Sequence, residues 1–176
     1  MTAAHHPETP AGRPTTGFQR VAVWLATGLG VGLLVRAPGT IGGLWGLPIA
    51  LASTWLPDTL WQAAMVSVLG GVGVWLCDTA ANALRSSDPQ PVVIDEIAAL
   101  PIVFLGLDDI GLGTLAGGFA LFRLFDIAKP GVVKWGERLP GGWGVMADDW
   151  LAALHALVVL RLFLWVDRSA GWGFFA

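Results

Sequence analysis

Apolar residues fall into six runs separated by polar segments of unequal length. The runs cover residues of about 21–35, 41–56, 60–77, 97–107, 110–125 and 150–166. None alternates polar and apolar positions with the period of two that is typical of a half-buried strand. The pattern therefore predicts helices. Several runs are shorter than the roughly 20 residues that a straight transmembrane helix requires, and Gly or Pro interrupts them, as at Pro48, Gly70 and Pro101.

Composition identifies lipid as the second solvent of these helices. Apolar residues make up 55% of the chain and charged residues 13%, against roughly 25% charged residues in an ordinary soluble domain. Mean hydropathy is +0.66. The 24 glycines suit close helix–helix approach in a membrane. We therefore expect an all-α protein, a compact integral-membrane helical bundle of short, Gly/Pro-interrupted helices.

Domain organisation follows from the same pattern. Residues 1–17 are polar and rich in Pro and Thr, which predicts a disordered N-terminal tail. Residues 18–170 then form a single membrane-embedded domain. The net charge of −3 gives no attraction to nucleic acid, and the single Cys77 excludes an internal disulfide and a cysteine-built zinc site. The oligomeric state is left open.

A count of crossings places the unusual polar segments on one face of the bilayer. If run 41–56 crosses away from the face that holds residues 36–40, run 60–77 returns, and runs 97–107 and 110–125 go out and back as a hairpin. Segments 36–40, 78–96 and 126–149 then share that face. It carries most of the cationic side chains outside the runs: Arg36, Arg85, Lys129, Lys134 and Arg138. The positive-inside rule makes this face cytoplasmic. Run 21–35 either spans or dips in and returns, so the side of the N-terminus stays open.

The shared face collects acidic side chains at the ends of apolar runs. A pair stands before run 97–107, another before run 150–166, and one acid lies between two cations at the spacing i, i+3, i+6. The acids are Asp95, Glu96, Asp126, Asp148 and Asp149, and the flanking cations are Arg123 and Lys129. Taken singly, each pair could cap a helix, and Asp126 could form an intrahelical ion triad with its neighbours. Capping, however, accounts for only one acid of each pair.

Together, five converging carboxylates would repel one another unless a cation were present. Oxygen ligands without clustered His or Cys favour a hard ion, so we expect Mg²⁺, held by Asp95, Glu96, Asp126, Asp148 and Asp149. Arg123 and Lys129 would bind phosphate oxygens. Thr40 is predicted to cap the helix that follows it, and the Gly39–Thr40 turn to offer backbone N–H groups to the same phosphate, although an ordinary capped turn explains these residues as well. His155 is interpreted as a buried structural residue.

Four segments carry a resemblance to a known family. They are PGTIGGLWGLP at 38–48, DPxxxVIDE at 88–96, FRLFDIAKP at 122–130 and GGWGVMADDWLA at 141–152. In this order and spacing the chain resembles bacterial phosphatidylglycerophosphatase A. The resemblance implies a multi-pass enzyme of the bacterial inner membrane, with its active site facing the cytoplasm. It would hydrolyse the terminal phosphate monoester of a phospholipid substrate, phosphatidylglycerophosphate, with Mg²⁺ as cofactor.

Roles within the site follow from chemistry. Asp126, Asp95 and Lys129 are the catalytic candidates, and Gly39, Thr40, Arg123 and Lys129 the candidate phosphate-binding residues. Water activated with the help of the metal, or a covalent aspartyl-phosphate at Asp126, are the two mechanisms left open. Three other functions are weighed. These are another membrane lipid-phosphate enzyme, a small transporter with an acidic ion site, and a structural membrane protein with ion-paired helix ends.

Overall fold

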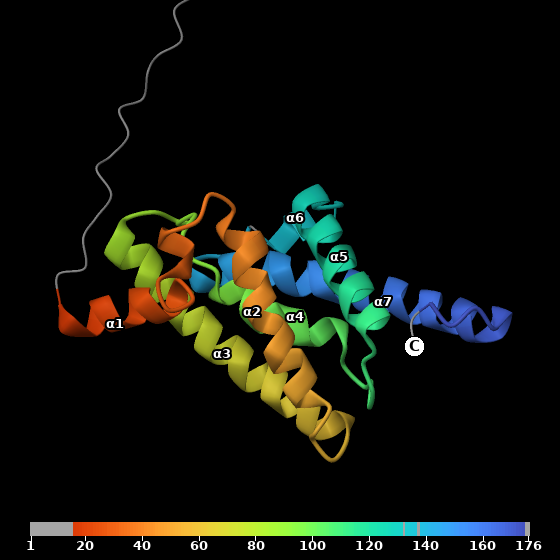
Figure 1. The fold of residues 1–176 in the computed structure, drawn as a ribbon. Coiled ribbons are helices and arrows are strands. Elements are labelled where there is room, and N and C mark those ends of the chain that lie inside the picture. Colours follow the sequence, from red (N-terminus) through yellow and green to blue (C-terminus); the bar gives the residue numbers. More distant parts are fainter. Residues whose placement is uncertain (1–15, 132, 137, 175–176) are drawn as a thin grey trace, which may run out of the picture.

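The computed structural model describes residues 16–131, 133–136 and 138–174, and every regular element in that part of the chain is helical. Residues 1–15 of the predicted tail 1–17 and the side chain of Lys134 lie outside the described residues, whereas Thr16 and Gly17 already belong to the start of a helix. The prediction of an all-α bundle is confirmed (Figure 1). Its elements are α1 (Gly17–Ala26), η1 (Val31–Leu33), α2 (Pro38–Ser53), α3 (Thr59–Leu84), α4 (Ile94–Val103), α5 (Leu112–Ala128), α6 (Val133–Gly136) and α7 (Gly142–Ala170).

The first apolar run does not form one helix, so the option of a full span there was wrong. Thr16 and Gln19 form a reciprocal capping box at the start of α1, which ends after ten residues. Ten residues of helix measure about 15 Å, half the thickness of the hydrocarbon core. Gly28 and Gly30 then take positive φ angles of 60° and 89° and turn the chain into η1. The Ala26 carbonyl accepts a hydrogen bond of 2.9 Å from Val93 N–H, which ties α1 to the start of α4.

Two helices, α3 and α7, are long and apolar enough to cross a membrane. Both exceed the runs that predicted them, because α3 continues to Leu84 and α7 begins at Gly142. The early start of α7 depends on glycine. A Cβ at Gly142 would overlap the Val74 carbonyl of α3, so only a residue without a side chain lets the two backbones approach this closely.

Helix α4 is the centre of the bundle and packs against α2, α3 and α7 (Figure 1). It is almost wholly buried, from Asp95 through Ile97 to Val103. Glycines of α2 let α4 approach closely. A Cβ at Gly42 would overlap Val93, and one at Gly46 would lie 2.9 Å from Leu100 Cβ. Spacing small residues four apart is a common way to bring two helices together in lipid.

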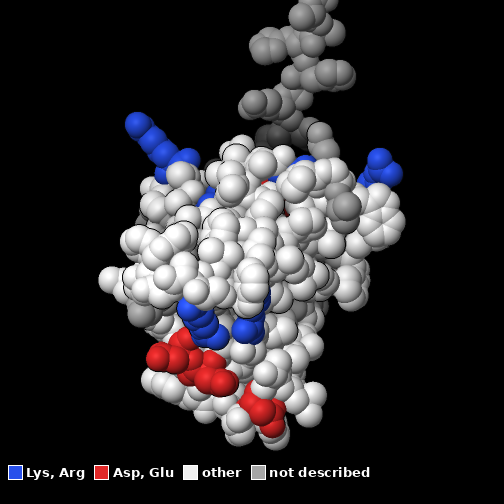
Figure 2. All heavy atoms as spheres, turned by 90° about the vertical axis from the view of Figure 1, so that its right-hand side faces the viewer, with Lys and Arg blue, Asp and Glu red and all other residues white. Residues whose placement is uncertain are grey.

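The helix ends lie on the two sides of the bundle that the count of crossings predicted. The N-terminal ends of α2, α4 and α7 and the C-terminal ends of α3 and α5 meet on one side, and the turns between α2 and α3 and between α4 and α5 lie opposite (Figure 1). Charged side chains are also separated on the face that contains the C-terminal part of α7 (Figure 2). Figure 2 shows Lys, Arg, Asp and Glu near the upper and lower edges of that face and an uncharged surface between them.

The α2–α4 contact yields a matched test of packing. Gly42→Ala should lower the free energy of unfolding by about 1–3 kcal/mol, because its methyl group overlaps Val93 in a filled interface. Gly71→Ala in α3 meets open space within 4 Å and should be neutral or gain up to about 1 kcal/mol from helix propensity. Thermal unfolding of the detergent-solubilised protein, followed by tryptophan fluorescence, measures both. Equal transitions for the two variants would contradict this account of the interface.

Candidate active site

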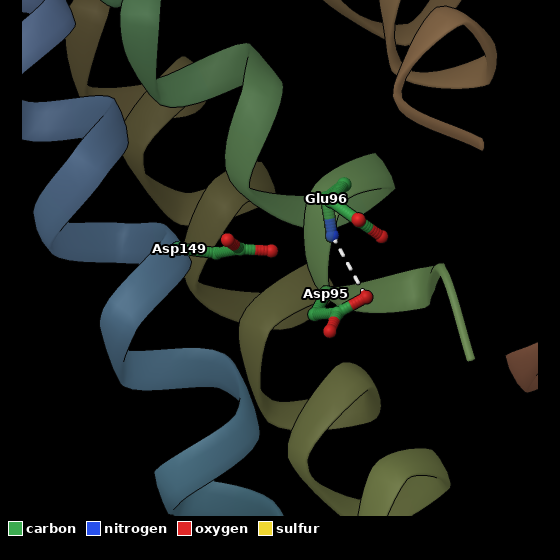
Figure 3. Close-up of side chains that lie close together, drawn as sticks. All are labelled: Asp95, Glu96 and Asp149. Atoms are coloured by element: carbon green, nitrogen blue, oxygen red, sulfur yellow. Dashed lines mark hydrogen bonds between the residues drawn. The ribbon is translucent and has the colours of Figure 1, made fainter. Parts of the chain in front are cut away.

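Three carboxylates converge where α4 meets α7. Asp95 and Glu96 lie in the first turn of α4, and Asp149 reaches toward them from α7 (Figure 3). Each of the three offers an oxygen within 4.8 Å of the other two, a spacing that suits shared ligation of one cation. These three side chains, here called the acid triad, are three of the five predicted metal ligands.

The acid triad is withdrawn from water. Asp149 is 3% exposed and Asp95 is 9% exposed. Burial raises the pKa of Asp95 well above its ordinary value, and the neighbouring charge of Glu96 raises it further. Burial also raises the pKa of Glu96, against the opposing effect of Arg123. Ionised carboxylates at this separation and depth are unfavourable without a compensating positive charge.

Unpaired oxygen atoms mark where a compensating positive charge would bind. Among the described residues, Glu96 Oε2, Asp148 Oδ1 and Asp149 Oδ2 are buried and have no hydrogen-bond partner. Leaving such atoms unsatisfied costs about 1–3 kcal/mol each, and more for charged groups. Three orphaned carboxylate oxygens in one region fit a hard divalent cation, which takes oxygen ligands and carries the required charge.

Positively polarised groups surround the acid triad and are here called the cationic border. They are Arg123, Lys129 and the N-terminal turn of α2. Arg123 Nη1 lies 2.5 Å from Asp126 Oδ2, one turn along α5, and 3.6 Å from Glu96 Oε1. The Arg123 guanidinium therefore links α5 to α4. Its Nε is buried without a partner and is free to donate to an incoming anion.

The Lys129 side chain does not extend along the side of α5 that its helical spacing predicted. The residue caps the C-terminus of α5 with a left-handed backbone (φ 41°). Its Nζ binds Asp148 Oδ2 on α7 at 2.6 Å. The prediction of Arg123, Asp126 and Lys129 along one helix side assumed that the helix continues to Lys129, whereas α5 ends at Ala128, just before Pro130. Lys129 thus joins two helices, and Asp126 and Asp148 are both paired with cations beside the acid triad.

The N-terminus of α2 completes the border, although the predicted cap was wrong. Pro38 already occupies the first helical turn and Ala37 is the N-cap, so Thr40 lies inside the helix and makes no capping bond. The first-turn N–H groups remain without a side-chain cap. Gly39 packs directly against the Glu96 carboxylate, and the Arg123 guanidinium lies 3.3 Å from the position that a Gly39 Cβ would take. The predicted phosphate-binding residues Gly39 and Arg123 are thus neighbours, whereas Thr40 is exposed.

Capping does not account for the second acid pair. Because α7 begins at Gly142, Asp148 and Asp149 lie within the helix, well past its first turn, and neither is a cap. In the first pair, Asp95 Oδ1 accepts a hydrogen bond from the Glu96 N–H at 3.0 Å, so one acid satisfies a first-turn donor of α4, whose N-cap is Val93 (Figure 3).

His155 is half-buried, with Nδ1 2.6 Å from the Leu151 carbonyl and its ring against Phe125, which agrees with a structural role.

Asp78 is a residue that sequence reasoning missed. It lies on α3, and its Oδ1 accepts a hydrogen bond of 3.4 Å from the Gly142 N–H at the start of α7. Since Gly141 has no side chain to cap α7, Asp78 takes the place of a cap from another helix. Its position directly after an apolar run, at the start of segment 78–96 on the shared face, was the available signal. Asp78 thereby helps to hold the helix that carries Asp148 and Asp149.

Comparison with known proteins agrees with the four motifs. The family model of phosphatidylglycerophosphatase A matches residues 24–164. Proteins named phosphatidylglycerophosphatase A from Escherichia coli and Haemophilus influenzae are 34% and 33% identical to the chain, each over 77% of it and over 79% and 84% of their own lengths. A Bacteroides thetaiotaomicron protein, provisionally named a phosphatidylinositol-3-phosphatase, is 39% identical over 82% of the chain and 94% of its own length.

No solved structure matches the chain significantly. The match of the family model spans most of the sequence and contains the acid triad, the cationic border and all four motifs. The resemblance drawn from those motifs is confirmed. The chain belongs to the phosphatidylglycerophosphatase A family, a family of phosphatase hydrolases.

Proposed function

We propose that this protein hydrolyses the terminal phosphate monoester of phosphatidylglycerophosphate, releasing phosphatidylglycerol and phosphate, with Mg²⁺ bound at the acid triad. The observation that carries the proposal is the set of orphaned, buried carboxylate oxygens next to an arginine with an unpaired Nε. Such a site attracts a divalent cation and a phosphate together. The names of the Escherichia coli and Haemophilus influenzae relatives supply the substrate.

The residues fit Mg²⁺ in number and kind. Asp95, Glu96 and Asp149 would hold the ion, and Asp126 and Asp148 stand beside it, each already paired with a cation. When bound, Mg²⁺ supplies charge neutralisation for phosphoryl oxygens and lowers the pKa of water.

The protein's own side chains bind and orient the phosphate. Arg123 presents Nε, and Lys129 adds a positive charge held in place by Asp148. The uncapped first turn of α2 at Gly39 adds backbone donors beside Arg123. Water attacks phosphorus, the bond to the glycerol oxygen breaks, and the leaving oxygen takes up a proton. Asp126, which is held by its ion pair with Arg123, would accept the proton of the attacking water.

The proposed location is the bacterial cytoplasmic membrane, crossed several times, with the site on the cytoplasmic side. Since α1 is too short to span, Arg20 would lie with the other cations at the site end, as the positive-inside rule favours for a cytoplasmic face. The opposite end carries Asp58, Asp108 and Asp109. On α7, Arg161 donates a hydrogen bond to the Leu105 carbonyl. Exposed Trp55 and Trp61 beside the α2–α3 turn suit an interface belt at that end.

Other functions fit the site less well. A transporter would spread acids through the membrane depth and usually repeats its architecture, whereas these acids meet at one end. A purely structural role would pair every buried charge, which the orphaned oxygens contradict. The relative named for phosphatidylinositol 3-phosphate shares the same chemistry, the removal of a phosphate monoester from a membrane lipid headgroup, so another lipid phosphate is the alternative substrate.

Removing one ligand should abolish activity without unfolding the protein. Asp149→Asn should lower Mg²⁺-dependent phosphate release from phosphatidylglycerophosphate in mixed micelles by at least about 100-fold, comparable to the loss of one strong transition-state contact. Asp108→Asn removes the same charge from an exposed turn at the opposite end and should keep full activity. Full activity of Asp149→Asn, or undiminished release by the wild type after EDTA treatment, would refute the proposed metal site.

Trapping distinguishes the two mechanisms. If water attacks directly, rapid acid quenching during turnover of ³²P-labelled substrate should leave no label on the protein above background. Label on the wild type that disappears in Asp126→Asn would instead establish an aspartyl-phosphate at Asp126. Because Asn preserves the shape of Asp126, near-ultraviolet circular dichroism of the variant serves as the control for folding.

A further inference from the structure

A polar groove leads away from the active site along the same end of the bundle. It consists of two cavities of about 230 and 400 Å³. Ser87 and Gly141 line both, so the cavities adjoin. One wall is the C-terminal part of α3 with the segment that follows it, and the other includes the glycine-rich start of α7. No part of the proposed chemistry uses this space.

The smaller cavity begins at the active site itself. Asp148 lines it and is 8% exposed. One oxygen of Asp148 binds Lys129, and the other is buried without a partner among the described residues. Asp88 and Ser87 add an acceptor and a hydroxyl to the same cavity. A molecule that carries a phosphate on Lys129 can therefore extend past Asp148 into the groove.

The larger cavity ends in positive charge. Arg85 caps α3 with a left-handed backbone (φ 55°), and its side chain is exposed and makes no ion pair within the described chain. Asn82 and Ser86 offer further polar groups beside it. Apart from Leu139 and Val145 in the smaller cavity and Ala81 in the larger, the lining is polar or glycine. Asp78 also lines the larger cavity, where its carboxylate accepts hydrogen bonds from the Gly142 N–H and from Asn82. The groove thus suits a hydroxylated ligand whose anionic group lies at Arg85, rather than an acyl chain.

We propose that this groove binds the part of the lipid headgroup that the reaction leaves intact, with the polyol against Ser87 and Asp88 and the bridging phosphodiester at Arg85. The inference rests on the proposed function, because the terminal phosphate must occupy the site beside Lys129. It makes Arg85 a specificity residue that recognises a phosphodiester next to the hydrolysed monoester. A guanidinium forms strong charge-assisted hydrogen bonds with phosphate.

The test separates groove contact from general charge. In mixed micelles with phosphatidylglycerophosphate and Mg²⁺, Arg85→Gln should raise KM about tenfold, the effect of losing one charge-assisted hydrogen bond, and leave kcat within twofold. Arg85→Lys should recover part of the loss. Arg20→Gln removes the same charge from the exposed face of α1 at the same end and should change neither constant more than twofold. Thermal unfolding of each variant verifies folding.

Each outcome decides something. If Arg85→Gln behaves like Arg20→Gln while the wild type is active, the groove does not bind the headgroup, and the proposed function stands. If Arg85→Gln lowers kcat and leaves KM unchanged, Arg85 acts on the chemistry and the binding proposal is wrong. If the folded wild type releases no phosphate from phosphatidylglycerophosphate, the proposed function and the groove proposal both fall.

Discussion

The architecture of this protein depends on holding several carboxylates together in a place that water barely reaches. Asp95, Glu96 and Asp149 lie within ligand distance of one another; Asp95 and Asp149 are buried and Glu96 is half-buried. Like charges at such distances repel strongly in a poorly polarisable interior. Arg123 compensates part of this repulsion through Glu96 and Asp126, and Lys129 does the same for Asp148. In the proposed function, the remaining unpaired oxygens bind a divalent cation, and the adjoining cationic side chains bind the phosphate.

The glycines explain how helices can carry this charge so close together. At Gly39, Gly42 and Gly46 the α2 backbone lies directly against α4, and at Gly142 the first turn of α7 lies against α3. A Cβ at Gly136 would lie 2.6 Å from the Asp148 N, so α6 also packs against the α7 backbone at the acidic positions. Each close approach removes a side chain that would otherwise hold the helices apart. The stability of the bundle and the geometry of the site therefore rest on the same contacts.

Much of this arrangement could be predicted from sequence because it depends on counting crossings. The alternation of apolar runs and turns placed Asp95, Asp126 and Asp149 at one end, and the helix ends lie there. Details that depend on helix boundaries could not be predicted. The hydrophobicity pattern does not reveal that Gly142 begins a helix, so the sequence alone allows Asp148 or Asp149 as a cap. Nor did spacing along α5 show that Lys129 turns away in a left-handed conformation to reach α7.

Thermal stability tests most directly whether the acid triad binds a divalent cation. Without Mg²⁺, Asp149→Asn removes one of three repelling charges and should unfold at a higher temperature than the wild type. On addition of Mg²⁺, at constant ionic strength set with NaCl, the unfolding temperature of the wild type should rise with concentration, and that of Asp149→Asn should stay constant. A wild-type unfolding temperature that does not respond to Mg²⁺, or an equal rise in both proteins, would contradict the account.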